Sequence, residues 1–163
     1  MKPSSYQQQT RDLIDGLKAV CASNGLGNDG NEYKIIVQTF LYKLLCDKFA
    51  HEMKRLDPKL AQAGDWIAAW QKLPERKQQY LEHGLSADTP RLSAGQLIAS
   101  LFNRQAEPGF ARLFDDTLIA IAAANSDIFA VKTDDGERVP LFDRLSDYVT
   151  GSAEKKDAFV RAL

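Results

Sequence analysis

The chain has 163 residues, 44% hydrophobic and 26% charged, which is ordinary for one globular domain. Its formal net charge of -1 excludes a protein that recognises its partners through a large overall charge. The two cysteines, Cys21 and Cys46, are too few for a disulfide-rich secreted scaffold and are expected to be buried free thiols. No signal peptide and no apolar run of about 18 residues occurs, so we expect a cytoplasmic protein with no membrane partner.

The first two predicted elements are helices joined by a short glycine-rich connection. Apolar residues at helical spacing predict an amphipathic helix over residues 6–23, ended by Asn24-Gly25. A long helix follows over about 30–56, with Asp29 and Glu32 as a capping box and Asp57-Pro58 as its end. Short connections favour antiparallel neighbours, so we expect a helical hairpin. The long helix is expected to bury one broad face, formed by Tyr33, Ile36, Val37, Phe40, Leu41, Leu44, Leu45, Phe49, Met53 and Leu56.

Shorter helices are predicted next. Asp65 caps one, and Pro74 begins another over residues 75–83. Ser93 caps a third that continues to Phe102, and a fourth covers about 110–125. Side chains of the first two are expected to cover the open face of the long helix; these are Trp66, Trp70, Leu73, Tyr80 and Leu81.

The pattern changes after residue 126. Imperfect alternation around Asp135-Gly136 predicts a small β-hairpin near 127–142 that packs against the helices. A helix near 142–149 and a last helix capped by Ser152 follow, and the last one reaches Leu163 with no stop signal. We therefore expect a fragment of a longer protein. The predicted fold is mainly α, a helical bundle around one long central helix, about 30–56, in a single domain over residues 1–163.

Few residues suggest a catalytic, cofactor-binding or metal-binding site. Residues 25–30 match G-x-G-x-x-G, but this dinucleotide-binding pattern must follow a strand, and here it follows a helix. We interpret it as a connection between helices. Neither His51 nor His83 has a second metal ligand at helical spacing, and the Asp115-Asp116 and Asp134-Asp135 pairs are expected to be solvated. We therefore expect no catalytic, cofactor-binding or metal-binding residue in this segment.

Basic residues are mildly concentrated on the polar side of the long helix and just beyond it. Acidic residues are interleaved with them, so two interpretations stay open. One is a solvated face with pairs such as Lys48 and Glu52, and the other is an edge that contacts DNA phosphates. The candidate DNA-binding residues are Lys34, Lys43, Lys48, Lys54, Arg55, Lys72, Arg76 and Lys77.

The stretch Asn28–Phe49, N-D-G-N-E-Y-K-x-x-V-x-x-F-L-Y-K-x-L-x-D-K-F, resembles the start of the modification subunit of type I restriction-modification systems. In that family, E-Y-K opens a long apolar helix that contains an F-L pair and a later aspartate. The matching residues here are Glu32-Tyr33-Lys34, Phe40-Leu41 and Asp47. The stretches LIASLFNRQAEPGFARLFDDTL and NSDIFAV resemble the family more loosely.

The resemblance implies an N-terminal helical domain that precedes a DNA adenine-N6 methyltransferase domain. The family's catalytic domain carries a glycine-rich S-adenosylmethionine motif and an N-P-P-F/Y motif that holds the flipped adenine. This sequence has neither motif, so the resemblance places the active site beyond Leu163 and leaves this segment non-catalytic. S-adenosylmethionine would be a cofactor of the parent protein only.

The implied role is to help enclose DNA and to assemble with the specificity subunit and a second modification subunit, in complexes that also recruit the restriction subunit. The specificity subunit would select the DNA target. A stand-alone helical module for protein–protein interaction, with no DNA role, stays open as the alternative. A helical regulator that binds a small molecule has no positive evidence in the sequence.

Overall fold

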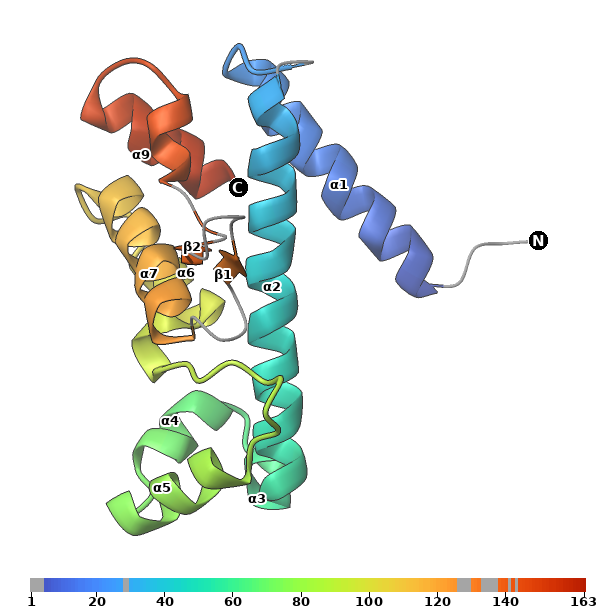
Figure 1. Cartoon of the computed structure of the whole chain (residues 1–163), viewed down its shortest axis with the longest axis vertical. Coiled ribbons are helices and arrows are strands. Elements are labelled where there is room, and N and C mark those ends of the chain that lie inside the picture. Colours follow the sequence, from blue (N-terminus) through green and yellow to red (C-terminus); the bar gives the residue numbers. More distant parts are fainter. Residues whose placement is uncertain (1–4, 28–29, 126–129, 133–137, 141, 143) are drawn as a thin grey trace.

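The computed structural model describes residues 5–27, 30–125, 130–132, 138–140, 142 and 144–163. One long helix, α2 (Gly30–Leu56), runs the length of the molecule, and the other elements lie along it (Figure 1). At about 1.5 Å per residue, this helix is roughly 40 Å long. The predicted long helix over 30–56 and the mainly helical fold are confirmed. The predicted N-cap, Asp29, lies outside the described residues.

Helix α1 (Ser5–Ser23) packs on α2 through its C-terminal half. Its fully buried side chains are Leu17 and Cys21, and Figure 1 shows the helix diverging from α2 toward the N-terminus. The helix ends where predicted, in a Schellman motif. The Leu26 N–H donates to the Cys21 carbonyl at 2.8 Å, and Gly25 has the left-handed φ of 76° that the motif requires. This turn reverses the chain, so α1 and α2 form the predicted helical hairpin.

The expected single buried face of α2 is wrong, because the helix has apolar residues on two sides. The side toward the body of the domain buries Ile35, Gln38, Tyr42, Leu45, Cys46, Phe49 and Met53. By contrast, Tyr33 is 73% exposed, Val37 41% and Leu44 40%. At roughly 100° per residue, these three lie opposite the buried side. Because α1 covers only part of this second side, its apolar residues remain in contact with solvent.

Three short helices surround the C-terminal end of α2, namely α3 (Pro58–Gln62), α4 (Trp66–Gln71) and α5 (Glu75–Gly84). Asp57 ends α2 as predicted and caps α3, while the Asp65 carboxylate accepts from the Ala68 N–H at 3.1 Å. Both caps are local, which is why the sequence predicts them.

An aromatic cluster joins α4 to α2. The ring centroids of Trp66 and Trp70 lie 6.3 and 5.5 Å from that of Phe49, within the range of favourable aromatic pairs. The prediction that Tyr80 covers α2 is wrong, because its side chain is 70% exposed on the outer side of α5. The other four predicted covering residues, Trp66, Trp70, Leu73 and Leu81, do pack on the core.

The remaining helical elements form a second group. They are η1 (Ala94–Gln96), α6 (Ile98–Asn103), α7 (Phe110–Ala124), η2 (Leu145–Tyr148) and α9 (Ala153–Ala162). In this group α9 and η2 pack on α7, and Figure 1 shows α6, α7 and α9 beside the N-terminal half of α2. The helix predicted from Ser93 to Phe102 is interrupted at Leu97, so it becomes a 3-10 turn and a short α-helix. The helix predicted near 142–149 is only the 3-10 turn η2. Ser152 caps α9 as predicted, with its Oγ accepting from the Lys155 N–H.

Two buried carboxylates hold the C-terminal segment on α7. Asp157 of α9 accepts from the Gly109 and Ala111 N–H groups at the start of α7, at 2.9 and 2.8 Å. Asp115 of α7 accepts from both the N–H and the hydroxyl of Ser146. The expectation that Asp115 is solvated is therefore wrong, since it is 2% exposed. Its neighbour Asp116 is exposed, as predicted.

Two three-residue strands, β1 (Ala130–Lys132) and β2 (Arg138–Pro140), pair antiparallel, with Val131 opposite Val139. The turn expected at Asp135-Gly136 lies outside the described residues, so the predicted hairpin near 127–142 stays a prediction. Within the described part of the chain, no helix combines the length and the apolar character needed to cross a membrane.

Candidate functional site

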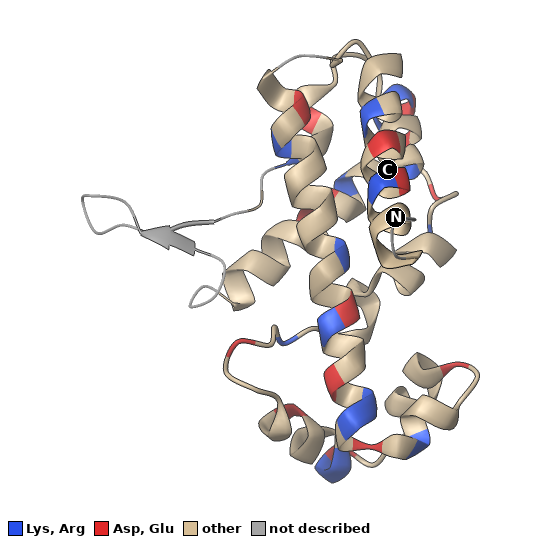
Figure 2. Cartoon of the chain, turned by 90° about the vertical axis from the view of Figure 1, so that its right-hand side faces the viewer, with Lys and Arg blue, Asp and Glu red and all other residues tan. Residues whose placement is uncertain are grey.

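The eight candidate DNA-binding residues do not gather on one surface. Lys72 follows α4, and Arg76 and Lys77 lie at the start of α5. The other five lie on α2 at different angles around its axis; they are Lys34, Lys43, Lys48, Lys54 and Arg55. Lys43 and Lys48, five residues apart, are rotated by roughly 140° from each other. Figure 2 shows lysine and arginine interleaved with aspartate and glutamate along the chain.

Four of the eight are paired with carboxylates. Lys43 pairs with Asp47, Lys48 with Asp88 at 2.8 Å, Arg55 with Glu52 at 2.7 Å, and Lys77 with Asp57 at 3.3 Å. The expected pair of Lys48 and Glu52 is thus wrong, because each residue has another partner. A fifth cation, the Lys54 ammonium, lies 5.7 Å from the centre of the Trp66 ring.

The other three, Lys34, Lys72 and Arg76, have no ion-pair partner in the described part of the chain. Lys34 lies near the start of α2, and the other two lie beyond its far end. The length of α2, roughly 40 Å, separates them. The unpaired charges therefore form two separate places for phosphate contact and no continuous basic surface.

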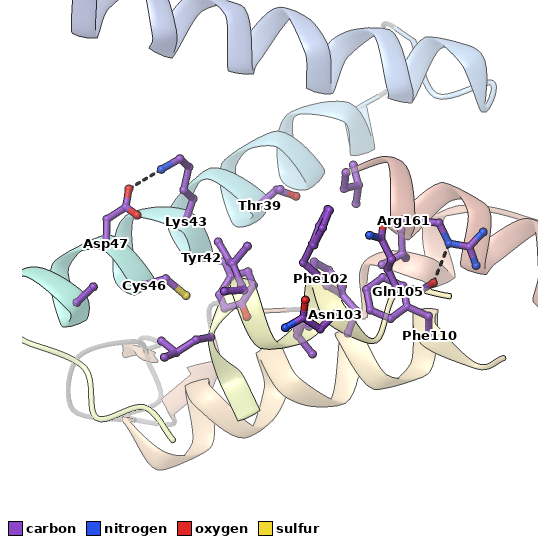
Figure 3. A pocket seen from close by; sticks show the side chains of 18 of the residues that line it. Thr39, Tyr42, Lys43, Cys46, Asp47, Phe102, Asn103, Gln105, Phe110 and Arg161 are labelled. Atoms are coloured by element: carbon purple, nitrogen blue, oxygen red, sulfur yellow. Dashed lines mark hydrogen bonds and ion pairs between the residues drawn. The ribbon is translucent and has the colours of Figure 1, made fainter. Parts of the chain in front are cut away.

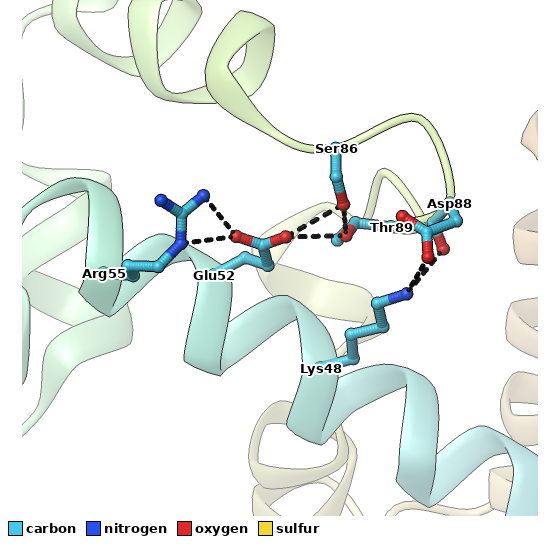
Figure 4. Close-up of polar contacts among 6 residues, drawn as sticks. All are labelled: Lys48, Glu52, Arg55, Ser86, Asp88 and Thr89. Carbon is cyan, nitrogen blue, oxygen red and sulfur yellow. Dashed lines mark hydrogen bonds and ion pairs between the residues drawn. The ribbon is translucent and has the colours of Figure 1, made fainter.

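A polar cluster joins α2 to the loop before η1 (Figure 4). Glu52 accepts from the Ser86 hydroxyl at 2.9 Å and from the Thr89 hydroxyl at 3.2 Å, in addition to its pair with Arg55. The Arg55 guanidinium and then the Ser86 hydroxyl lower the pKa of Glu52. Lys48 likewise lowers the pKa of Asp88 to about 2. These groups satisfy one another, so the cluster positions the loop and leaves no free acid or base.

A groove, here named the α2 groove, runs along one side of α2 (Figure 3). Its volume is about 710 Å³. Leu13 of α1 borders it on one side and α6 on the other, and the C-terminal end of α9 closes one end. Its lining is mainly apolar, and its polar members are Thr39, Tyr42, Lys43, Cys46, Asp47, Asn103, Gln105 and Arg161.

The titratable groups on the floor of the α2 groove are held neutral. Burial raises the pKa of Cys46 to about 11, so its thiol is not a nucleophile near neutral pH. Burial also raises the pKa of Tyr42, whose hydroxyl donates to the Gln96 carbonyl. The α2 groove therefore offers shape and apolar surface for binding, and neither Cys46 nor Tyr42 is ionised near neutral pH to act as a nucleophile or base.

No metal centre is visible among the described residues, where no group of three or more His, Cys, Asp or Glu side chains comes together. His51 and His83 are both exposed, and the His83 Nδ1 lies 2.6 Å from the Gln79 carbonyl. The described residues of the G-x-G-x-x-G pattern connect two helices, as expected, since α1 ends at Ser23 and α2 begins at Gly30.

Sequence reasoning missed the α2 groove and the Glu52 cluster. Ala50, Ile98 and Phe102 had no pattern that marks them as groove residues, because the groove forms only when three helices meet. Glu52 and Thr89 are 37 residues apart, so no local spacing connects them. Comparison with protein-family models, with curated proteins and with solved structures finds no match for this chain.

Proposed function

We propose that this chain is the N-terminal accessory domain of the modification subunit of a type I restriction-modification system. The parent enzyme would transfer a methyl group from S-adenosylmethionine to adenine N6 in DNA. The observation that carries the proposal is the Asn28–Phe49 stretch, whose Glu32-Tyr33-Lys34, Phe40-Leu41 and Asp47 match the family's pattern. These residues all lie on α2, the helix along which the rest of the domain packs. The segment 127–142 would complete the domain as a hairpin.

In this role, the domain contributes binding surfaces for other subunits and no catalytic residues. The hydrogen-bonding groups of the polar cluster around Glu52 pair with one another, and burial keeps Tyr42 and Cys46 of the α2 groove protonated. Exposed apolar side chains such as Tyr33 and Val37 suit assembly with the specificity subunit and a second modification subunit. The restriction subunit would join the larger complex, and the whole assembly would work in the cytoplasm.

DNA contact is proposed at the unpaired cations first. Lys34, Lys72 and Arg76 have no ion-pair partner among the described residues and can neutralise phosphates, whereas the paired lysines must first lose a carboxylate partner. Two separated contacts at the ends of α2 suit a domain that encloses DNA together with other subunits. They suit less well a domain that binds DNA tightly by itself. The isolated domain is therefore expected to bind DNA weakly and without sequence preference.

The experiment that tests the proposal starts from the reading frame after Leu163. It should encode a glycine-rich S-adenosylmethionine motif and an N-P-P-F/Y motif. The complete subunit, purified with its specificity subunit, should transfer labelled methyl groups to adenine in DNA, and residues 1–163 alone should transfer none. A reading frame without these motifs contradicts the proposal.

The alternative function is a stand-alone helical module for protein–protein interaction. The ion pairs of Lys43, Lys48, Arg55 and Lys77 favour it, because they reduce the positive charge available to DNA. Such a module would bind a protein partner with an affinity that DNA does not change. A DNA-independent partner, together with a reading frame that lacks the methyltransferase motifs, would decide for it.

A further inference from the structure

The shape of the α2 groove suits a helix. Its floor includes three small side chains of α2, Thr39, Cys46 and Ala50, which share one side of that helix. Eleven residues separate the first from the last, so the floor is about 16 Å long, equal to three helical turns. Small side chains allow two helix axes to approach to about 8–10 Å. An added helix would lie between α1 and α6 and complete a bundle.

The α6 wall of the α2 groove exposes apolar surface. Phe102 is 64% exposed and Ile98 is 38% exposed, although both are large apolar residues. They are four residues apart on α6, so they stand on the same side of that helix. Figure 3 shows Phe102 standing between α6 and α2. A row of exposed apolar residues along a groove is typical of a surface that another protein covers.

The charge of the α2 groove lies at one end. Lys43 and Asp47 neutralise each other along the side of the groove. At the α9 end, the Arg161 Nε donates to the Gln105 carbonyl at 2.8 Å, which holds the guanidinium in place. No carboxylate in the described part of the chain pairs with Arg161. The α9 end of the groove therefore carries the Arg161 guanidinium, which is held by the Gln105 carbonyl and is suited to bind a carboxylate.

We propose that the α2 groove binds an amphipathic helix of a partner protein. This helix lays an apolar stripe of about three turns on Thr39, Cys46 and Ala50, and it places an aspartate or glutamate at the Arg161 end. The Thr39 Oγ1, which is buried without a hydrogen-bond partner among the described atoms, lies in the floor under the docked helix. We argue this binding from the groove alone, so it is compatible with both the accessory domain and the stand-alone module. Its failure would not decide between those two functions.

The test uses a fluorescent synthetic helix of about four turns, with leucines at helical spacing and a glutamate at one end. Fluorescence anisotropy measures its binding to residues 1–163 and to the complete protein. Two control peptides carry lysine in place of that glutamate, or the same residues in scrambled order. We expect the helix to bind both proteins and to bind at least about 10-fold more tightly than either control peptide.

Protein variants assign the binding to the groove. Ala50→Phe fills the floor, and Phe102→Ser removes an exposed wall residue at little risk to folding; each should weaken binding about 10-fold or more. Arg161→Glu should weaken binding of the glutamate peptide and strengthen binding of the lysine peptide. Arg112→Glu is the matched control, because Arg112 is exposed on α7 and does not line the groove. Circular dichroism checks that each variant is folded.

Three outcomes would overturn the proposal. The first is no binding of the glutamate peptide to either protein. The second is equal binding of the scrambled peptide, which would indicate nonspecific apolar contact. The third is binding that folded Phe102→Ser and Arg161→Glu leave unchanged, which would place the peptide elsewhere on the surface.

Discussion

The buried carboxylate of Asp157 offers a direct test of how the C-terminal segment is held. Its two oxygens accept from the Gly109 and Ala111 N–H groups, which begin α7 and have no acceptor within that helix. Asp157→Ala removes both bonds and leaves the Ala111 N–H in a residue that is 4% exposed. Losing a cap costs about 1 kcal/mol, and a buried unsatisfied donor costs about 1–3 kcal/mol. We therefore expect the free energy of unfolding to fall by roughly 3 kcal/mol.

Urea denaturation followed by circular dichroism measures this change, with a thermal scan as a second observable. For a chain of this size, each kcal/mol lowers Tm by about 2–4 °C, so Tm should fall by roughly 6–12 °C. Asp147→Ala is the matched control, because its carboxylate is 66% exposed and its pair with Lys156 spans 3.6 Å. That change should cost less than about 0.5 kcal/mol. If Asp157→Ala costs no more than this control, Asp157 does not hold α9 on α7.

The remaining predictions concern pH, DNA and a thiol. Burial raises the pKa of Asp115, so this carboxyl adds stability below its unfolded pKa and loses that contribution as pH rises through its folded pKa. Urea melts at a series of pH values should show the free energy of unfolding, relative to Asp115→Asn, falling as pH rises above the unfolded pKa of about 3.9; an opposite slope contradicts this. Charge reversal at Lys34 should reduce the salt dependence of DNA binding by the full complex, by about 0.9 in log–log slope, more than reversal at the paired Lys43. Unchanged affinity and slope in both variants would remove this helix from the DNA interface. Because its pKa is raised to about 11, Cys46 should react with iodoacetamide near pH 8 about 10-fold more slowly in the folded chain than in urea; equal rates would mean that the thiol is not buried.

Features that depend on neighbouring residues were predictable from the sequence. Asp57 and Asp65 cap helices that begin immediately after them, and Gly25 provides the left-handed turn that ends α1. Their partners lie within five residues along the chain, so spacing alone identifies them. This is why the C-terminal end of α2 and the start of α9 agree with the predicted positions.

Features that depend on distant partners were not predictable. The apolar residues of α2 divide between two sides. One side is buried by the body of the domain, whereas exposure of the other side depends on how much of α2 is covered by α1. Asp115 is buried because its hydroxyl partner, Ser146, lies 31 residues away, while Asp116 next to it stays exposed. The carboxylate partners of Lys48 and Lys77 lie 40 and 20 residues away, so charge counting overstated the free positive charge. For the same reason, no sequence pattern indicated the α2 groove.

We propose that this domain serves a DNA adenine methyltransferase without catalysing the reaction. The most direct measurement is transfer of labelled methyl groups from S-adenosylmethionine to DNA, for the complete subunit with its specificity subunit and for residues 1–163 alone. We predict label on adenine N6 with the complete complex and none with residues 1–163. A complete subunit that transfers no methyl group with its specificity subunit present, or transfer by residues 1–163 alone, would contradict the claim.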